Sequence, residues 1–191
     1  MVDLDRTFLS FDTFRCDLRA VLSKKPWYLF FLIKILMKKG LAETKYQFAL
    51  LHPQKKEDYR TNPFFFQYLM RQKNRPLWLV TGASEVHAQS IQRFYPFFTE
   101  CYASNRQKNC SVAVKQEWLN KKGVTVYDYA GDRLGDYVLF QHARTACIVN
   151  PSFALFVKLS IFPLKNCQFF DVHPFKKALF FWLKPTAEKS V

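Results

Sequence analysis

Residues 76–84 read PLWLVTGAS, and this stretch indicates the fold class. Residues 77–80 form an apolar run of strand length, which Thr81 and Gly82 close. Ser84 is a suitable N-cap for a helix that we expect over residues 84–95. A strand followed directly by a helix is the repeating unit of a parallel α/β sheet.

The same pattern recurs further along the chain. GVTVYDYAGD (123–132) and TACIVNPS (145–152) each end an apolar run in small or polar residues, and a helix-length stretch over 115–122 precedes them. NCQFFDV (166–172) reads as a further short strand, and residues 174–185 as a short helix. The sequence therefore predicts an α/β fold with a three-layer, Rossmann-like parallel sheet.

The segment 12–75 has a different character. It contains no clear strand pattern, and prolines and a glycine divide it into helical blocks. Asp12 or Thr13 is a suitable cap for the first block, and Thr61 or Asn62 for the last. We interpret 12–75 as an all-helical cap inserted after the first strand.

Positive charge is concentrated in that predicted cap. The whole chain carries a net charge of +14, and residues 15–75 hold 14 Lys and Arg against 4 Asp and Glu. Such a patch attracts nucleic acid, an anionic membrane face or a phosphorylated substrate, or it is simply a solvated surface. No basic helix or aromatic platform of a known nucleic-acid-binding type is present, so we expect no specific nucleic-acid binding.

The stretch 27–37 is apolar except for Lys34, and pairs of lysines flank it. Because a helix needs about 20 apolar residues to cross a bilayer, this stretch is too short to span one. Two interpretations remain: the helix is buried within the cap, or it lies in a membrane interface with its lysines on the headgroups. The second would give the protein a peripheral membrane contact.

The five cysteines are scattered and form no CxxC pair, which argues against a disulfide framework and against a zinc site. We also expect no export leader, because the first residues lack a charged stretch followed by an apolar run and a small-residue cleavage site. We therefore expect a cytoplasmic protein, with the inner face of the membrane as the site of any peripheral contact.

Acidic side chains occur where strands of the predicted sheet end. Asp3 lies on or at the end of a first strand, and in an extended backbone Asp5 points the same way. Asp132 and Asp136 close a later strand at helical spacing, which puts them near one face. Reactive groups of such sheets lie just past the carboxyl ends of the strands. Carboxylates gathered at this edge suit a hard divalent cation such as Mg²⁺.

Phosphate-binding groups are available at the same edge. Thr81 and Gly82 close the neighbouring strand, and the free N–H groups of the following helix complete a phosphate cradle. A lysine is required to offset the charge of phosphate and carboxylates. Lys115 stands before an apolar helix and is preferred, while Lys108 is the alternative.

These residues resemble the haloacid dehalogenase (HAD) superfamily. Phosphatases of that family carry DxDxT after the first strand, Ser or Thr after the second, Lys before a helix and GDxxxD after a later strand. The matching stretches here are VDLDRT (2–7), VTGAS (80–84), VKQEWL (114–119) and AGDRLGD (130–136). More narrowly, VDLD, VTGAS, YDYAGD and VNPS look like the phosphatase-like domain often fused to UbiA-type polyprenyl transferases. The resemblance covers roughly residues 1–152.

The resemblance implies a domain plan and a chemistry. Residues 1–11 and 76–191 would form the HAD-like core, and 12–75 its cap. The activity implied is a Mg²⁺-dependent phosphatase acting through an aspartyl-phosphate, on a small phosphorylated molecule or on a lipid-linked or multiply anionic phosphate. By this resemblance, Asp3 would be the nucleophile and Asp5 the general acid and base. The phosphate-binding residues would be Thr81, Gly82 and Lys115. The metal-binding residues would be Asp3, Asp5, Asp132 and Asp136.

The chain departs from the family pattern at two points. Arg6 stands where relatives have Gly, at a tight turn. The first strand has only two residues ahead of Asp3, where strands typically run five or six. The alternative function is therefore a weak or inactive scaffold of the same fold that binds an anionic partner.

Overall fold

The computed structural model describes residues 1–72 and 74–170, so the helix predicted over 174–185 lies outside the described residues. Within them, every strand pairing in the sheet is parallel. The strands are β1 (Leu77–Ser84), β2 (Phe98–Ser104), β3 (Asp128–Gly131), β4 (Thr145–Val149) and β5 (Cys167–Phe170). β1 pairs with β2, and β4 lies between β3 and β5.

The first residues of the chain join these two groups of strands. The Val2 N–H donates to the Trp78 carbonyl at 2.8 Å, and the Val80 N–H donates to the Val2 carbonyl at 2.9 Å. On the other side, the Asp3 N–H donates to the Ala130 carbonyl at 3.0 Å. The short first strand is therefore held on both edges, between β1 and β3.

Seven α-helices are found in the described residues. They are α1 (Thr13–Lys24), α2 (Tyr28–Leu51), α3 (Pro63–Arg71), α4 (Glu85–Phe94), α5 (Val112–Lys121), α6 (Tyr137–His142) and α7 (Phe153–Ile161). Side chains of Asp12, Asn62 and Ser84 cap α1, α3 and α4 by accepting backbone N–H bonds, each at one of the predicted cap positions.

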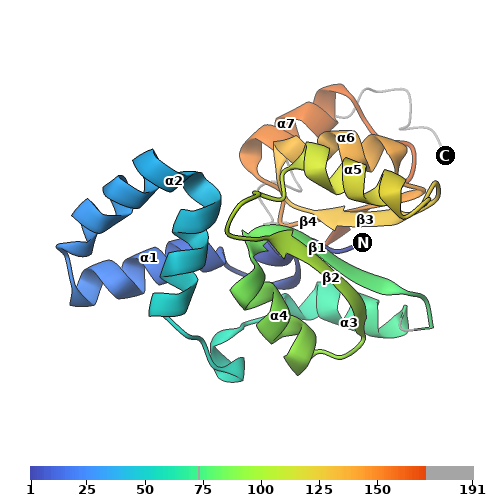
Figure 1. Ribbon diagram of the computed structural model, residues 1–191. Helices are drawn as coiled ribbons and strands as arrows, with labels where there is room; N and C mark the ends of the chain where they lie inside the picture. Colours follow the sequence, from blue (N-terminus) through green and yellow to red (C-terminus); the bar gives the residue numbers. More distant parts are fainter. Residues whose placement is uncertain (73, 171–191) are drawn as a thin grey trace.

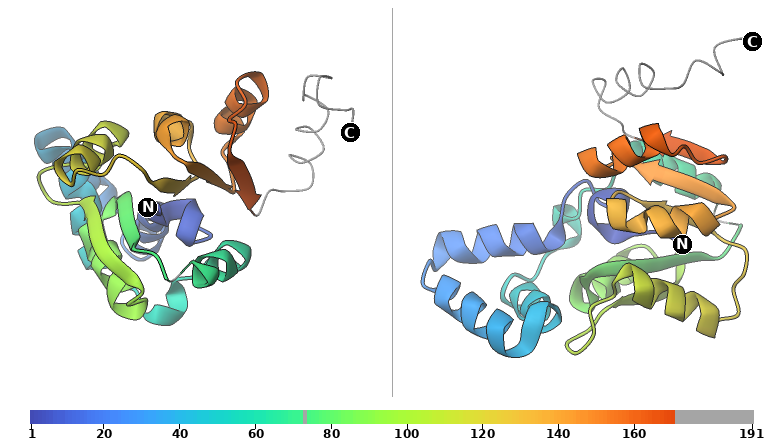
Figure 2. Two further views of the ribbon diagram at one scale, coloured as in Figure 1. Left: turned by 90° about the vertical axis from the view of Figure 1, so that its right-hand side faces the viewer. Right: turned by 90° about the horizontal axis from the view of Figure 1, so that it is seen from above.

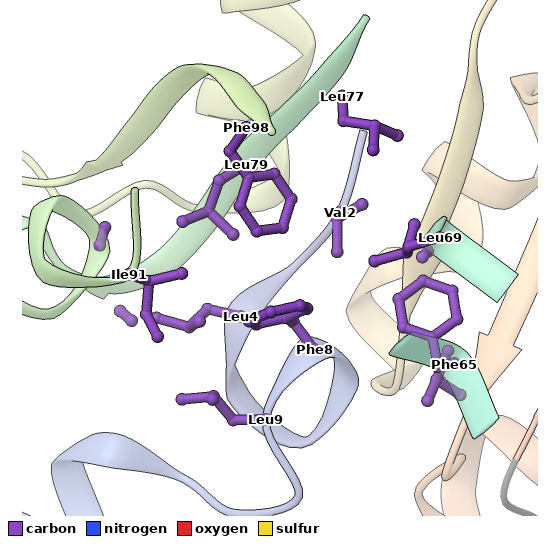
Figure 3. Close-up of a cluster of buried hydrophobic side chains, with 14 of the residues drawn as sticks. Val2, Leu4, Phe8, Leu9, Phe65, Leu69, Leu77, Leu79, Ile91 and Phe98 are labelled. Atoms are coloured by element: carbon purple, nitrogen blue, oxygen red, sulfur yellow. The ribbon is translucent and has the colours of Figure 1, made fainter. Parts of the chain in front are cut away.

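Alternation along the strands creates two apolar faces. In β4, Cys147 and Val149 belong to a cluster with α3 and α4, whereas Ala146 and Ile148 belong to a second cluster with α5, α6 and α7. Figure 2 shows these helix groups on opposite sides of the sheet, and Figure 3 shows the first cluster, where Val2 lies between Leu79 and Leu69. The predicted α/β class with a parallel sheet is confirmed.

Helices α1 and α2 project away from the sheet as a pair (Figure 1). α2 bends at Gly40, whose φ of +77° is a left-handed value that glycine adopts without strain. α3 behaves differently, because its Phe65 and Leu69 are buried in the first apolar cluster beside the sheet.

The stretch 27–37 lies on the projecting pair, and most of it faces solvent. Trp27 is 62% exposed, Phe30 77% and Met37 82%, while Ile35 is buried. The interpretation that this stretch is buried within the cap is therefore wrong. None of the helices in the described part of the chain has both the length and the apolarity needed to cross a membrane.

Candidate active site

Three carboxylates meet at the edge of the sheet. Asp3 ends the first strand, Asp132 directly follows β3, and Asp136 ends the short 3₁₀ turn Leu134–Asp136. One oxygen from each lies within 4.8 Å of the others, and all three residues are buried. The structure thus brings together three of the four predicted metal-binding residues through their side chains.

Asp132 lacks the partners that a buried carboxylate needs. Both of its oxygens are buried, and no described residue donates a hydrogen bond to either. The nearest cationic atoms are Arg6 Nε at 3.4 Å and Arg133 Nε at 3.7 Å. Burial and the charge of Asp3 raise the pKa of Asp132 to about 8.

A divalent cation would remove this electrostatic conflict. It would offset the mutual repulsion of the carboxylates and supply the missing partner of Asp132. Mg²⁺ favours hard oxygen ligands, a few carboxylates together with water and phosphate oxygens. The donor set of Asp3, Asp132 and Asp136 therefore fits this ion.

Asp136 is fixed by its neighbours. Its Oδ1 accepts a hydrogen bond from the Tyr129 hydroxyl at 2.8 Å, and Tyr129 in turn accepts one from Lys115 Nζ at 2.8 Å. Gly131 permits the close approach, because a Cβ there would lie 2.8 Å from Asp136 Oδ2. Tyr129 was not a predicted site residue; as part of an apolar strand it carried no signal of this role.

The structure separates the two candidate lysines. Lys115 is buried, with its Nζ 3.4 Å from Asp3 Oδ1 and 3.7 Å from Asp136 Oδ1. Burial lowers the pKa of Lys115, but Asp3 and Asp136 outweigh it, and the net pKa is raised. Lys108 instead forms an exposed ion pair with Glu117 at 2.9 Å. Of the two candidates, Lys115 therefore lies beside Asp3 and Lys108 does not.

Asp3 and Asp5 lie in different surroundings. Asp3 Oδ1 accepts the Leu4 N–H at 2.9 Å, and no described residue hydrogen-bonds to its Oδ2. The Asp5 carboxylate lies apart from the three-carboxylate cluster and accepts the Thr13 N–H at 2.9 Å. Burial, Asp12 and Asp3 raise the pKa of Asp5 to about 6. A carboxyl group with such a pKa can carry a proton near neutral pH.

The chain turns at Arg6, directly after Asp5. Its φ of +57° is left-handed, as the Gly in the family pattern would suggest, and its N–H donates to the Phe11 carbonyl at 2.9 Å. The side chain reaches Asp132. The departure at this position therefore brings a guanidinium to the carboxylate cluster.

Thr81 and Gly82 lie at the end of β1, where the register with β2 shifts. The buried Thr81 hydroxyl accepts the Ala83 N–H at 3.1 Å, which leaves its own hydrogen free to donate. The Gly82 carbonyl accepts a bond from Lys45 Nζ at 2.7 Å. Lys45 comes from α2 and was not predicted; one lysine among many in a basic segment gives no sequence signal.

A cavity of about 660 Å³ opens over these groups. Its walls combine the carboxylates and Lys115 with Thr81, Lys45 from α2 and Arg133. Phe14 and Leu41, from α1 and α2, add an apolar side. The cavity is therefore polar at its base and partly apolar where the projecting helices border it.

A buried polar network ties α1 to α4. Asp17 accepts hydrogen bonds from His87 Nε2 at 2.6 Å and His52 Nδ1 at 3.0 Å, and the other ring nitrogen of His87 bonds the Tyr59 hydroxyl at 2.9 Å. These residues lie far apart along the chain, so the sequence alone did not indicate that they form hydrogen bonds with one another. The network anchors the base of the projecting helices to the sheet's helical layer.

No family model, no curated protein and no solved structure matches this chain.

Proposed function

We propose that the protein is a Mg²⁺-dependent phosphatase that hydrolyses phosphate monoesters. The convergence of Asp3, Asp132 and Asp136 beside the buried Lys115 carries this proposal. We further propose that the architecture is a three-layer, HAD-type core with a helical cap that the α1–α2 pair forms within the predicted insertion 12–75, while α3 packs with the core. The projecting α1–α2 pair bordering the cavity supports that assignment.

Asp3, Asp132, Asp136 and the backbone carbonyl of Asp5 would hold the ion. When bound, Mg²⁺ would neutralise phosphate charge and fix the orientation of the phosphoryl group. Lys115 and Thr81 bind the remaining phosphoryl oxygens, Lys115 through its ammonium and Thr81 through its hydroxyl.

Two carboxylates of the chain then carry out different steps of the reaction. Asp3 Oδ2 attacks phosphorus, so that an O–P bond forms as the ester P–O bond breaks. Asp5 gives its proton to the leaving oxygen, and the alcohol departs. Asp5, now a carboxylate, takes a proton from water, which attacks the aspartyl-phosphate, releases inorganic phosphate and regenerates Asp3.

The surroundings of the cavity suggest the substrate class. Lys45 and Arg133 favour additional anionic groups, while Phe14 and Leu41 favour an apolar portion. We therefore propose a multiply anionic or lipid-linked phosphate ester.

Arg6 supports a second candidate, a weak or inactive scaffold that binds an anionic partner. Its Nε lies 3.4 Å from Asp132 Oδ2, so its charge competes for the carboxylate that would otherwise bind the ion. In this case phosphate esters bind in the cavity without turning over.

The test is a phosphate ester panel, including polyprenyl phosphates and sugar phosphates, assayed with MgCl₂ and with EDTA. We expect Mg²⁺-dependent phosphate release that Asp3→Asn abolishes and that Lys108→Ala, a matched surface change, leaves within about threefold of wild type. Binding of esters without release by the wild type would favour the scaffold. Release by Asp3→Asn at the wild-type rate would exclude the proposed nucleophile.

A further inference from the structure

The part of α2 before Gly40 displays large apolar side chains to solvent. Over residues 27–37, the exposed large apolar residues are Trp27, Leu29, Phe30, Phe31, Ile33, Leu36 and Met37. Scattered exposed apolar residues are normal, but a contiguous set of this size marks an interaction surface. This set lies on the α1–α2 pair, where it projects farthest from the sheet (Figures 1 and 2).

Helical spacing places most of these side chains on one arc. At 100° per residue, five of them fall on one side of the helix, namely Leu29, Phe30, Ile33, Leu36 and Met37. The buried Ile35 lies on the opposite side, and α1 packs against α2. The apolar arc therefore points outward, away from the rest of the described chain.

Positive charge borders this arc. Residues 18–42 contain six Lys and Arg and no Asp or Glu. Lys34 and Lys38 follow the arc along one edge of the helix, and no ion pair within residues 1–72 and 74–170 neutralises either of them. An apolar face beside unpaired lysines is the pattern of a helix that lies in a membrane interface.

We propose that the α1–α2 pair docks on the surface of an anionic lipid bilayer. The apolar arc enters the boundary between headgroups and acyl chains, and the lysines contact lipid phosphates. A second copy of the chain fits less well, because a symmetric contact through this face would bring two sets of six cationic side chains together.

Docking here has a consequence for the cavity. α2 continues past Gly40 into Leu41 and Lys45, both of which line the cavity. The docked helix would thus lead from the lipid interface to the proposed phosphate site. This consequence rests on the proposed function, whereas the docking itself does not.

The experiment is flotation of the full chain with vesicles of phosphatidylcholine alone or with 30% phosphatidylglycerol. Wild type should float with the anionic vesicles and at least fivefold less with the neutral ones. The triple variant Phe30→Ser, Ile33→Ser, Met37→Ser should lose at least fivefold of the bound fraction. Lys34→Gln with Lys38→Gln should lose about threefold, and more in low salt than in high salt.

Two variants serve as controls for the flotation experiment. Phe153→Ser removes an aromatic ring that is 65% exposed on α7, outside the proposed surface, and should float as wild type does. Asp3→Asn should also float as wild type does, so that a failure of the proposed catalysis does not affect this result. Far-UV circular dichroism and an unchanged melting temperature would show that the triple variant is folded.

A spectroscopic readout locates the contact. Anionic vesicles should shift the tryptophan emission of wild type to shorter wavelength, and Trp27→Phe should lose that shift. Equal flotation of wild type and triple variant would overturn the proposal, as would equal binding to neutral and anionic vesicles. So would a dimer, detected by sedimentation velocity, that the triple variant dissociates while wild type fails to bind vesicles.

Discussion

The ammonium of Lys115 lies 3.4 Å from Asp3 Oδ1, so a buried cation at the start of α5 faces the carboxylate that ends the first strand. Asp136 lies 3.7 Å from the same ammonium. Lys115 is thereby the positive counterpart of the acidic cluster, and its loss would leave that cluster with excess negative charge.

Lys115→Met should lower kcat/KM by at least about 100-fold, because the phosphoryl group loses a charge that stabilises the transition state. Lys108→Met is the matched control, since its ion pair with Glu117 is exposed, and it should stay within about threefold of wild type. Phosphate release from the best ester of the panel measures both. Similar losses of kcat/KM in the two variants would contradict the assignment of Lys115 as the phosphate-binding lysine.

Gly131→Ala should weaken Mg²⁺ binding by about 10–100-fold, because the new Cβ would meet Asp136 Oδ2 at 2.8 Å and displace this carboxylate. The increase in melting temperature with MgCl₂ concentration measures this affinity without relying on activity. Gly123→Ala is a useful comparison, as open space surrounds that position, although its φ of +66° makes the substitution mildly strained. An unchanged Mg²⁺ midpoint in Gly131→Ala would show that Asp136 does not bind the ion.

Arg6→Gly should change the free energy of unfolding by less than about 1 kcal/mol, because relief of the left-handed φ is offset by the greater freedom of glycine in the unfolded chain. The same variant should tighten Mg²⁺ binding at least threefold, since a guanidinium 3.4 Å from Asp132 is removed. Arg6→Ala separates the two effects: it also loses the charge but keeps the strained backbone. Weaker Mg²⁺ binding in both would show that Arg6 supports the site rather than competing with the ion.

Asp128 should stabilise the fold in a pH-dependent way. It accepts two hydrogen bonds from Arg144, at 3.0 and 2.9 Å, and a further short one from Arg75. Burial alone would raise the pKa of Asp128, but these arginines lower it to about 2. Because the pKa is lower in the folded chain than in the unfolded one, the stabilisation is present above about pH 4 and is lost as pH falls toward 2.

Urea unfolding of wild type and Asp128→Asn at pH 6 and pH 3 measures this effect. After allowance for solvent screening, we expect wild type to be more stable by about 1 kcal/mol at pH 6, with a smaller difference at pH 3. A difference that grows on acidification would contradict the ion pairing.

Part of the fold could be predicted from the preferences of neighbouring residues for strands, turns and helix caps. The apolar runs before Thr81 and Asn150 mark the positions of β1 and β4, and Asp12 and Ser84 cap helices as their side chains suggest. β2 escaped prediction because it mixes polar and apolar residues, as expected of a strand that pairs with a single neighbour, β1, among the described strands. The short α7 was missed in a stretch without clear periodicity.

The sequence by itself determined which residue types end which strands, because turn, cap and strand preferences act between near neighbours along the chain. Only the tertiary structure decided that Asp3, Asp132 and Asp136 share a space of a few ångströms, and that Lys115 rather than Lys108 joins them. It also decided that Phe30 and Met37 face solvent. Such relationships depend on how separate elements pack, and the energy of packing is not encoded in any one segment.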